Sequence, residues 1–202
     1  MGKNYTMLEE DNYVFLEKFL DTTKSNLFFA KGIILVEGWA EEILLPSIAK
    51  MIGIDLTKKG ISIINIGNVG FEHYKNIFLR RNEPDMTIPV AIITDSDVRE
   101  YEKVQALNDE GKPLKDDKNK NIYNFEKIDV EEKRNSAITN KEANSEKNIK
   151  YFVAPLWTFE YSLFKSNSLS THFKNAIESI HTGTNWEDDF EDFEDDFLDD
   201  DL

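Results

Sequence analysis

The apolar residues of this chain fall into short runs that alternate with helical patterns. Four apolar runs predict strands, at 33–36, 61–67, 88–97 and 151–154, and the branched run at 33–36 suits a strand covered on both faces. Between and after them, apolar residues recur at helical spacing, which predicts helices at 41–52, around 71–81, from about 157, and at 170–183. This alternation predicts an α/β fold with a central parallel sheet of about four strands, right-handed crossovers and flanking helices.

The segments outside this alternation differ in character. Residues 8–30 begin with a helical pattern that fades, so residues 1–26 are expected to form an N-terminal helical segment. The main domain is expected to span 27–182, with a polar and partly mobile surface insertion at about 108–149. The acidic tail, 183–202, is predicted to be disordered.

Composition narrows the class of protein. The 202 residues include no cysteine, which excludes disulfides and thiolate zinc sites. Neither a signal peptide nor an apolar run of about 20 residues is present, so we expect a cytoplasmic protein that does not enter a membrane. The net charge is −15, but residues 187–201 hold 11 acids and no base, which leaves 28 acids against 24 bases elsewhere. This nearly balanced body neither favours nor excludes binding to nucleic acid.

Acidic residues follow two of the predicted strands. Glu37 ends the first strand and Asp95 the third, and ligands of an open parallel sheet bind outside the carboxyl ends of its strands. Asp97 lies two residues past Asp95, and Glu41 would return to the same edge one helical turn after Glu37. Gly38 is expected to let the backbone bend sharply between the strand and the helix.

Carboxylates gathered in this way repel one another unless a cation neutralises them. Oxygen ligands suit Mg²⁺ or Mn²⁺, and such ions commonly serve phosphoryl chemistry. The alternative for either acidic motif taken alone is a solvated loop or a helix cap. Acids at two separate strand ends that share one edge favour a metal site.

Four motifs in the expected order carry a family resemblance. They are "ILVEGWAEEILLP", "INIGNVGF", "PVAIITDSD" and "WTFEYSLF". Together they resemble the Toprim domain of the OLD (overcoming lysogenization defect) family of nucleases over about residues 27–165. The resemblance implies a Toprim (Rossmann-like) fold, a DNA endonuclease that uses two Mg²⁺ or Mn²⁺ ions, and a role in phage defence.

The resemblance also implies roles for individual residues. The acids of the motifs match the metal ligands of the family: Glu37, Glu41, Asp95, Asp97 and Glu160. From the residues alone, Glu160 is equally explained as an acid favoured at a helix N-terminus. Gly38, Asn68 and Gly70 would shape the loops beside the metals, although ordinary turn chemistry also accounts for Asn68 and Gly70.

Two features depart from the family pattern. OLD proteins carry an ATPase domain, but this chain has no G-x-x-x-x-G-K-[ST] sequence and is not expected to bind ATP by itself. We therefore expect it to be a fragment, a separate subunit or the partner of an ATPase, and a homo-oligomer is also compatible with the sequence. The family's catalytic lysine has only Lys165 and Lys174 as candidates after Glu160, and a lysine in either position is more often a solvated helix residue.

Alternative functions remain at the sequence level. The chain could be a non-catalytic Toprim module that binds DNA or an ATPase partner, or a primase or topoisomerase type of Toprim protein. In the tail, Phe190, Phe193 and Phe197 would share one face of a helix, so a partner could induce helical structure there. The simpler interpretation of the tail is a disordered, solubilising segment.

Overall fold

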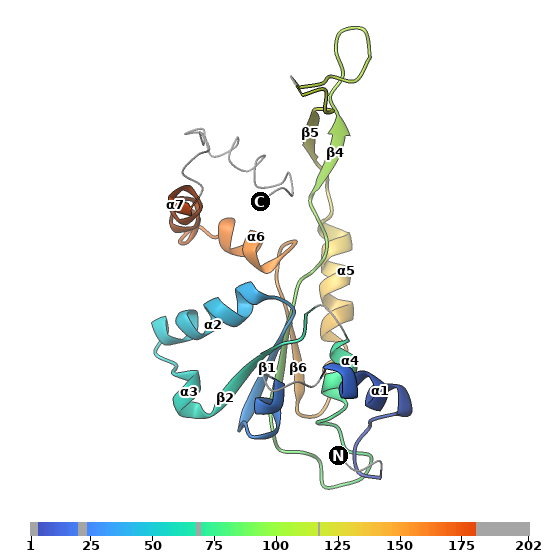
Figure 1. Cartoon of the computed structure of the whole chain (residues 1–202), viewed down its shortest axis with the longest axis vertical. Helices are drawn as coiled ribbons and strands as arrows, with labels where there is room; N and C mark the ends of the chain where they lie inside the picture. Colours follow the sequence, from blue (N-terminus) through green and yellow to red (C-terminus); the bar gives the residue numbers. More distant parts are fainter. Residues whose placement is uncertain (1–3, 20–23, 68–69, 117, 181–202) are drawn as a thin grey trace.

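A parallel sheet forms the centre of the molecule. The computed structural model describes residues 4–19, 24–67, 70–116 and 118–180. The sheet has four strands in the order β2-β1-β3-β6, and each neighbouring pair is parallel (Figure 1). The strands are β1 (Gly32–Val36), β2 (Ile61–Asn65), β3 (Val90–Thr94) and β6 (Ile149–Val153). The α/β class with a four-stranded parallel sheet is therefore confirmed.

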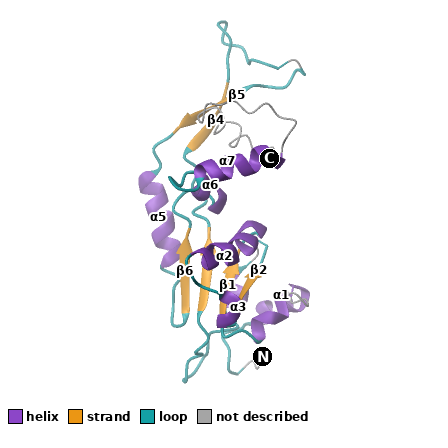
Figure 2. Cartoon of the chain, turned by 90° about the vertical axis from the view of Figure 1, so that its left-hand side faces the viewer, coloured by secondary structure: helices purple, strands orange, loops and turns teal. Residues whose placement is uncertain are grey.

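Helices lie on both sides of this sheet (Figures 1 and 2). One side carries α2 (Trp39–Met51) and α3 (Leu56–Lys59). The other carries α1 (Glu10–Phe19), α4 (Phe71–Lys75) and α5 (Glu131–Glu142), and a short 3-10 helix, η1 (Lys24–Phe28), precedes β1. Beyond the upper end of the sheet in Figure 1 lie α6 (Phe159–Phe164) and α7 (Ser170–Ile180).

The main core forms because the strands alternate with helices that cover both faces of the sheet. Its fully buried side chains come from the strands and from the helix that follows β2, among them Ile33, Leu35, Ile64, Tyr74, Val90, Ile92 and Ile149. Burial of one such branched side chain contributes about 1.5–3 kcal/mol to folding. The core therefore fixes the register of the strands, and with it the position of the residues that follow them.

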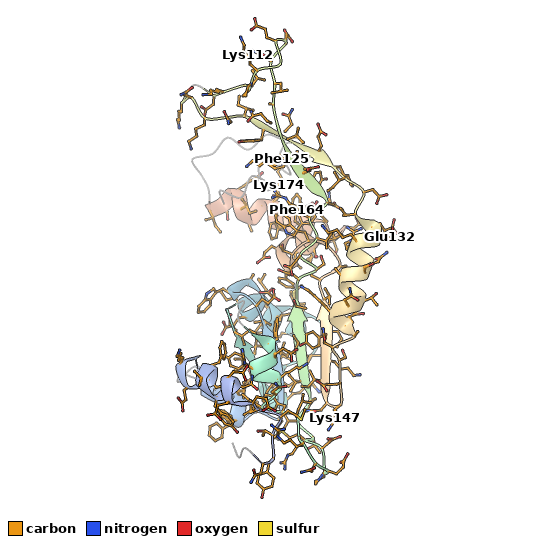
Figure 3. All side chains as sticks on the ribbon, turned by 90° about the vertical axis from the view of Figure 1, so that its right-hand side faces the viewer. Lys112, Phe125, Glu132, Lys147, Phe164 and Lys174 are labelled. Carbon is orange, nitrogen blue, oxygen red and sulfur yellow. The ribbon has the colours of Figure 1, made fainter. Side chains whose placement is uncertain are left out.

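A second, smaller core lies beyond the sheet. Strands β4 (Tyr101–Gln105) and β5 (Tyr123–Lys127) form an antiparallel hairpin that extends away from the sheet (Figure 1). At its base, Phe125 packs with the buried Tyr161 and Phe164 of α6. Figure 3 shows Phe125 and Phe164 facing the same region between the hairpin and α6.

A buried polar cluster ties the same region together. Glu100 is 9% exposed; it accepts a hydrogen bond from Tyr161 Oη at 3.1 Å and pairs with Arg134 Nη1 at 3.1 Å. Since Arg134 lies on α5 and Tyr161 on α6, this carboxylate links both helices to the segment after β3. The charged donor Arg134 and the neutral donor Tyr161 together stabilise the buried Glu100 carboxylate.

Several elements differ from the sequence predictions. The predicted strands 33–36, 61–67, 88–97 and 151–154 correspond to β1, β2, β3 and β6, each with shifted ends. The helix expected around 71–81 ends as α4 at Lys75, and the 8–30 pattern contains α1 and η1. The sequence patterns do not predict α3, α5 or the hairpin of β4 and β5. Both β5 and α5 lie within the polar 108–149 region and give it more regular structure than its composition indicates.

The acidic tail, including Phe190, Phe193 and Phe197, lies outside the described residues, so its predicted disorder stays a prediction. Among the helices that the structure describes, none combines the length and the apolar character needed to cross a bilayer.

Candidate metal centre

The register of β1 and β3 places Glu37 close to Asp95. Val36 pairs with Ile93 across β1 and β3, so the next residue, Glu37, stands beside Thr94. Thr94 Oγ1 donates a short hydrogen bond to Glu37 Oε1. Asp95 follows Thr94 directly, and both acids therefore leave the sheet at the carboxyl ends of neighbouring central strands.

The Asp95–Asp97 loop is fixed against the segment between β6 and α6. Ser96 Oγ donates to the carbonyl oxygen of Leu156 at 2.7 Å, and the Asp97 amide donates to the Trp157 carbonyl at 3.2 Å. The Phe159 amide, at the start of α6, donates to Asp95 Oδ1 at 2.7 Å. Asp97 takes a left-handed backbone conformation, φ 59°, which aspartate tolerates better than most residues. These contacts bring the beginning of α6, and with it Glu160, to the rim of the sheet.

Glu41 lies in the first turn of α2 and is only 2% exposed. Its Oε2 has no hydrogen-bond partner among the described residues. A Cβ added at Gly38 would lie 2.9 Å from that oxygen. The backbone bends at Gly38 as expected, but with φ −131°, extended backbone that any residue adopts, so the bend itself does not require glycine. The glycine instead leaves room for the Glu41 carboxylate.

We expect Gly38→Ala to displace the Glu41 carboxylate and to lower the affinity for Mn²⁺ about tenfold, as loss of a supporting contact at a metal site commonly does. The free energy of unfolding should change by about 1 kcal/mol or less, because alanine accepts this backbone conformation. Titration calorimetry and thermal unfolding measure the two effects. Gly32→Ala at the opposite end of β1, where an added Cβ meets only an ordinary 3.4 Å contact, is the matched control. An unchanged affinity in Gly38→Ala would contradict this role.

Four carboxylates share one electrostatic environment at this edge. The pKa of Asp95 is raised to about 7, chiefly by burial and further by the charges of Glu37, Glu41 and Glu160. The hydrogen bond from the Phe159 amide acts in the opposite direction and lowers this pKa. Burial also raises the pKa of Glu41, followed by the charges of Glu160 and Glu37, while the backbone amides of Glu41 and Gly38 oppose it. The acids at the two strand ends, on α2 and on α6 therefore lie near enough to disfavour one another's charges.

The fifth expected acid has a different partner. Asp97 Oδ2 forms a short ion pair with Lys141 Nζ, and the same ammonium donates to the backbone carbonyl oxygen of Asp95 at 2.7 Å. The Asp97 side chain is 68% exposed, and that of Lys141 is 30% exposed. Asp97 is thus next to the other acids in sequence but is held by a cation from α5.

The donor set fits a hard divalent cation. Carboxylate oxygens are the ligands that Mg²⁺ and Mn²⁺ prefer, and a bound cation would reverse the mutual repulsion that raises the Asp95 pKa. The unpartnered Glu41 Oε2 is a buried acceptor that such an ion would satisfy. In the part of the chain that is described, however, no three acidic or histidine side chains already converge at metal-binding distance. Ion binding would therefore require side-chain movement, most simply of Asp97 away from Lys141.

The two candidate lysines and the loop residues predicted near the site lie in different environments. Lys165 Nζ lies 5.9 Å from the centroid of the Tyr161 ring, and Lys174 Nζ lies 3.9 Å from Glu178 Oε1 within α7. Gly70 has φ 68° and precedes α4, so its left-handed conformation supports the turn interpretation. Asn68 lies outside the described residues.

Comparison with known families identifies the segment that holds most of these acids. Residues 28–97 match the family described as "Overcoming lysogenization defect protein-like, TOPRIM domain". These residues form an OLD-like Toprim domain. Glu37, Glu41, Asp95 and Asp97 all lie within the matched Toprim segment, whereas Glu160 lies outside it.

Solved structures of the C-terminal regions of OLD proteins also match the chain. The C-terminal region of the Xanthomonas campestris pv. campestris OLD protein is 21% identical over 79% of this chain and 66% of that chain, with a TM-score of 0.48. A second structure of that region is 36% identical over 35% of this chain and 32% of its own, with a TM-score of 0.31. The corresponding region from Burkholderia pseudomallei is 24% identical over 80% of this chain and 69% of its own, with a TM-score of 0.46.

The chain therefore spans 66% of the first of these solved chains and 32% of the second, less than two thirds of either. A search of curated proteins found no significant match.

Two residues next to the Toprim acids were missed at the sequence level. Thr94 could have been noticed, because a hydroxyl residue directly before Asp95 in a buried strand has to find an acceptor. Lys141 left no such signal: it lies in a polar stretch, and its proximity to Asp97 arises only because α5 packs along β6.

Proposed function

We propose that this chain is a divalent-metal-dependent DNA endonuclease that nicks or cleaves phosphodiester bonds. The observation that carries the proposal is the gathering of Glu37 and Asp95, with Glu41 and Glu160 close by, at the carboxyl edge of a parallel sheet. Their charges disfavour one another, as the raised pKa of Asp95 reflects, and bound cations would remove this repulsion. The OLD-like Toprim match of residues 28–97 supports the same function.

The proposed ligands are Glu37, Glu41, Asp95, Asp97 and Glu160. Bound Mg²⁺ or Mn²⁺, as two ions, would lower the pKa of a water molecule and neutralise charge on the reacting phosphate. Glu37 is oriented by Thr94, and Asp95 by the Phe159 amide, so both carboxylates are positioned before any ion arrives. We keep Lys165 and Lys174 as candidates for the catalytic lysine that would stabilise the transition-state phosphate.

We also propose that the chain acts with an ATPase domain or subunit. The solved chains that it resembles are described as C-terminal regions of OLD proteins, which supports a preceding domain in those proteins. Association with a second copy of this chain is compatible with the same arrangement.

One observation favours a second candidate, a non-catalytic Toprim module that binds DNA or the ATPase. Among the residues described, the acids do not yet converge on a single point, and Asp97 is paired with Lys141. A primase or topoisomerase type of activity has no comparable support.

Incubation of supercoiled plasmid with the purified chain tests the proposal. Nicked or linear DNA should form with Mg²⁺ or Mn²⁺ and not with EDTA, because the carboxylates need the ion to act on a phosphate. Glu37→Ala and Asp95→Ala should both lose this activity. Glu17→Ala, which changes an exposed acid of α1 away from the site, is the matched control and should retain it.

The outcomes separate the two candidates. Negligible nicking by every variant, the natural chain included, would overturn the claim that this chain alone is a nuclease and favour the binding module. Equal nicking by the natural chain and both site variants would overturn the assignment of the ligands.

A further inference from the structure

Lys141 is the cationic side chain that contacts the acidic loop of the site. It lies in the last turn of α5, and its Nζ contacts both the Asp97 carboxylate and the Asp95 carbonyl oxygen. In sequence, 44 residues separate Lys141 from Asp97, so the contact is a product of the fold. None of the roles proposed above uses this lysine.

Contacts at both ends of α5 fix the position of Lys141 beside the acidic loop. The helix packs along β6, and Arg134 in its first half pairs with the buried Glu100, which is also bonded to Tyr161. At its other end, Lys141 Nζ is anchored at 2.7 Å from a backbone carbonyl that cannot leave the strand end. The lysine side chain is 30% exposed, so the ammonium remains open to solvent on one side.

The Lys141 ammonium occupies Asp97 Oδ2 and, as a positive charge, repels a cation that approaches the same carboxylate. Ligation of an ion through Oδ2, or through both carboxylate oxygens, therefore requires the ion pair to open. Opening leaves the ammonium, still near the Asp95 carbonyl, without its carboxylate. A phosphate oxygen of DNA at the site is the anion that would take its place.

We propose that Lys141 exchanges partners during the reaction: it holds Asp97 in the metal-free protein and contacts a phosphate of the DNA once divalent ions are bound. This inference rests on the proposed function for its DNA substrate. It makes Lys141 a residue with two opposing effects, since it weakens metal binding in the absence of DNA and strengthens DNA binding in the presence of metal.

Lys141→Met removes the charge and keeps most of the side-chain length, and Lys141→Arg keeps the charge. Lys133→Met is the matched control, because Lys133 is an exposed lysine of the same helix. Titration calorimetry of the DNA-free proteins gives the affinity for Mn²⁺. Binding of a short DNA duplex in Ca²⁺, an ion that supports little phosphoryl transfer, is measured across a salt series and needs no cleavage.

We expect Lys141→Met to bind Mn²⁺ about threefold more tightly, the effect of losing one exposed ion pair. Its affinity for DNA should fall, and the slope of log affinity against log salt should decrease by about 0.9, the value for one lost phosphate contact. Lys141→Arg should keep the natural slope, and Lys133→Met should match the natural chain in both measurements.

Two results would overturn the inference. Weaker or unchanged Mn²⁺ binding in Lys141→Met would mean that the lysine does not compete with the ion for Asp97. An unchanged salt slope would mean that it does not contact a phosphate. Both readouts are independent of cleavage, so absence of plasmid nicking would overturn the proposed nuclease and leave this test intact.

Discussion

Asp95→Asn is expected to abolish nicking and, at the same time, to stabilise the metal-free protein. Loss of a carboxylate ligand should reduce the nicking rate by about 100-fold or more, since even supporting contacts of metal ligands are worth 10- to 100-fold. At pH 8 the same change removes a charge that burial and three neighbouring acids disfavour. Asn can still accept the hydrogen bond that the Phe159 amide donates at 2.7 Å to Oδ1.

The expected gain in the free energy of unfolding is about 2 kcal/mol. The rise of the Asp95 pKa from 3.8 to about 7 corresponds to ~4 kcal/mol, and we halve this because the side chain is only partly buried. A gain of this size raises the midpoint of thermal unfolding by about 4–8 °C for a chain of this length.

Asp97→Asn is the matched control for this prediction. It also removes a proposed ligand and should also lose nicking, but its side chain is 68% exposed, so its effect on metal-free stability should be small. Thermal unfolding in EDTA at pH 8 and plasmid nicking in Mg²⁺ measure the two properties. If Asp95→Asn were less stable than the natural chain at pH 8, the claim that burial and neighbouring carboxylates disfavour the Asp95 charge would be contradicted.

The second large effect concerns pH and metal removal. In metal-free protein the folded state holds a proton on Asp95 up to about pH 7, whereas the unfolded chain releases it near 3.8. The stabilising contribution of this proton is therefore fully present below 3.8 and is lost as the pH rises through about 7. The raised pKa of Glu41 acts in the same direction.

Saturating Mn²⁺ should reverse this loss. At 100 times the dissociation constant, an ion that binds only the folded chain adds about 2.7 kcal/mol, or roughly 5–10 °C, at pH 8. Because the ion and the proton compete for the same carboxylates, this gain should shrink as the pH falls below about 7. Thermal unfolding from pH 5 to 8, with Mn²⁺ or with EDTA, measures both trends. A metal-free stability that rises steadily over this range would contradict the assignment.

The part of the fold that carries the site could be predicted because its residues follow simple rules. Ile33 to Val36 is short, apolar and branched, which suits a strand buried on both faces, and the runs that became β2, β3 and β6 are also short and rich in apolar residues. Once the sheet is parallel, Glu37 and Asp95 must share an edge. Glu160 entered only through family resemblance, and the Phe159 amide bound to Asp95 explains how α6 reaches that edge.

The hairpin and α5 could not be predicted because their stability comes from contacts distant in sequence. The α5 residues have no apolar face; Arg134 finds its partner Glu100 outside the helix, and Lys141 finds Asp97. Phe125 of β5 lies in a polar stretch, and it packs in the small apolar cluster around Tyr161 and Phe164 of α6. Gly38 was predicted to matter, but for backbone freedom, and only the distance to Glu41 Oε2 reveals the steric reason.

Diffraction from crystals soaked in Mn²⁺, recorded at the manganese absorption edge, tests the central claim most directly. We expect anomalous peaks between the carboxylates of Glu37, Glu41, Asp95 and Glu160, with Asp97 turned from Lys141 toward the ion. Crystals of Asp95→Asn should lack at least one of these peaks. An absence of peaks at this edge of the sheet in the natural chain, or ordered Mn²⁺ only at other surface acids, would contradict a metal centre at these carboxylates.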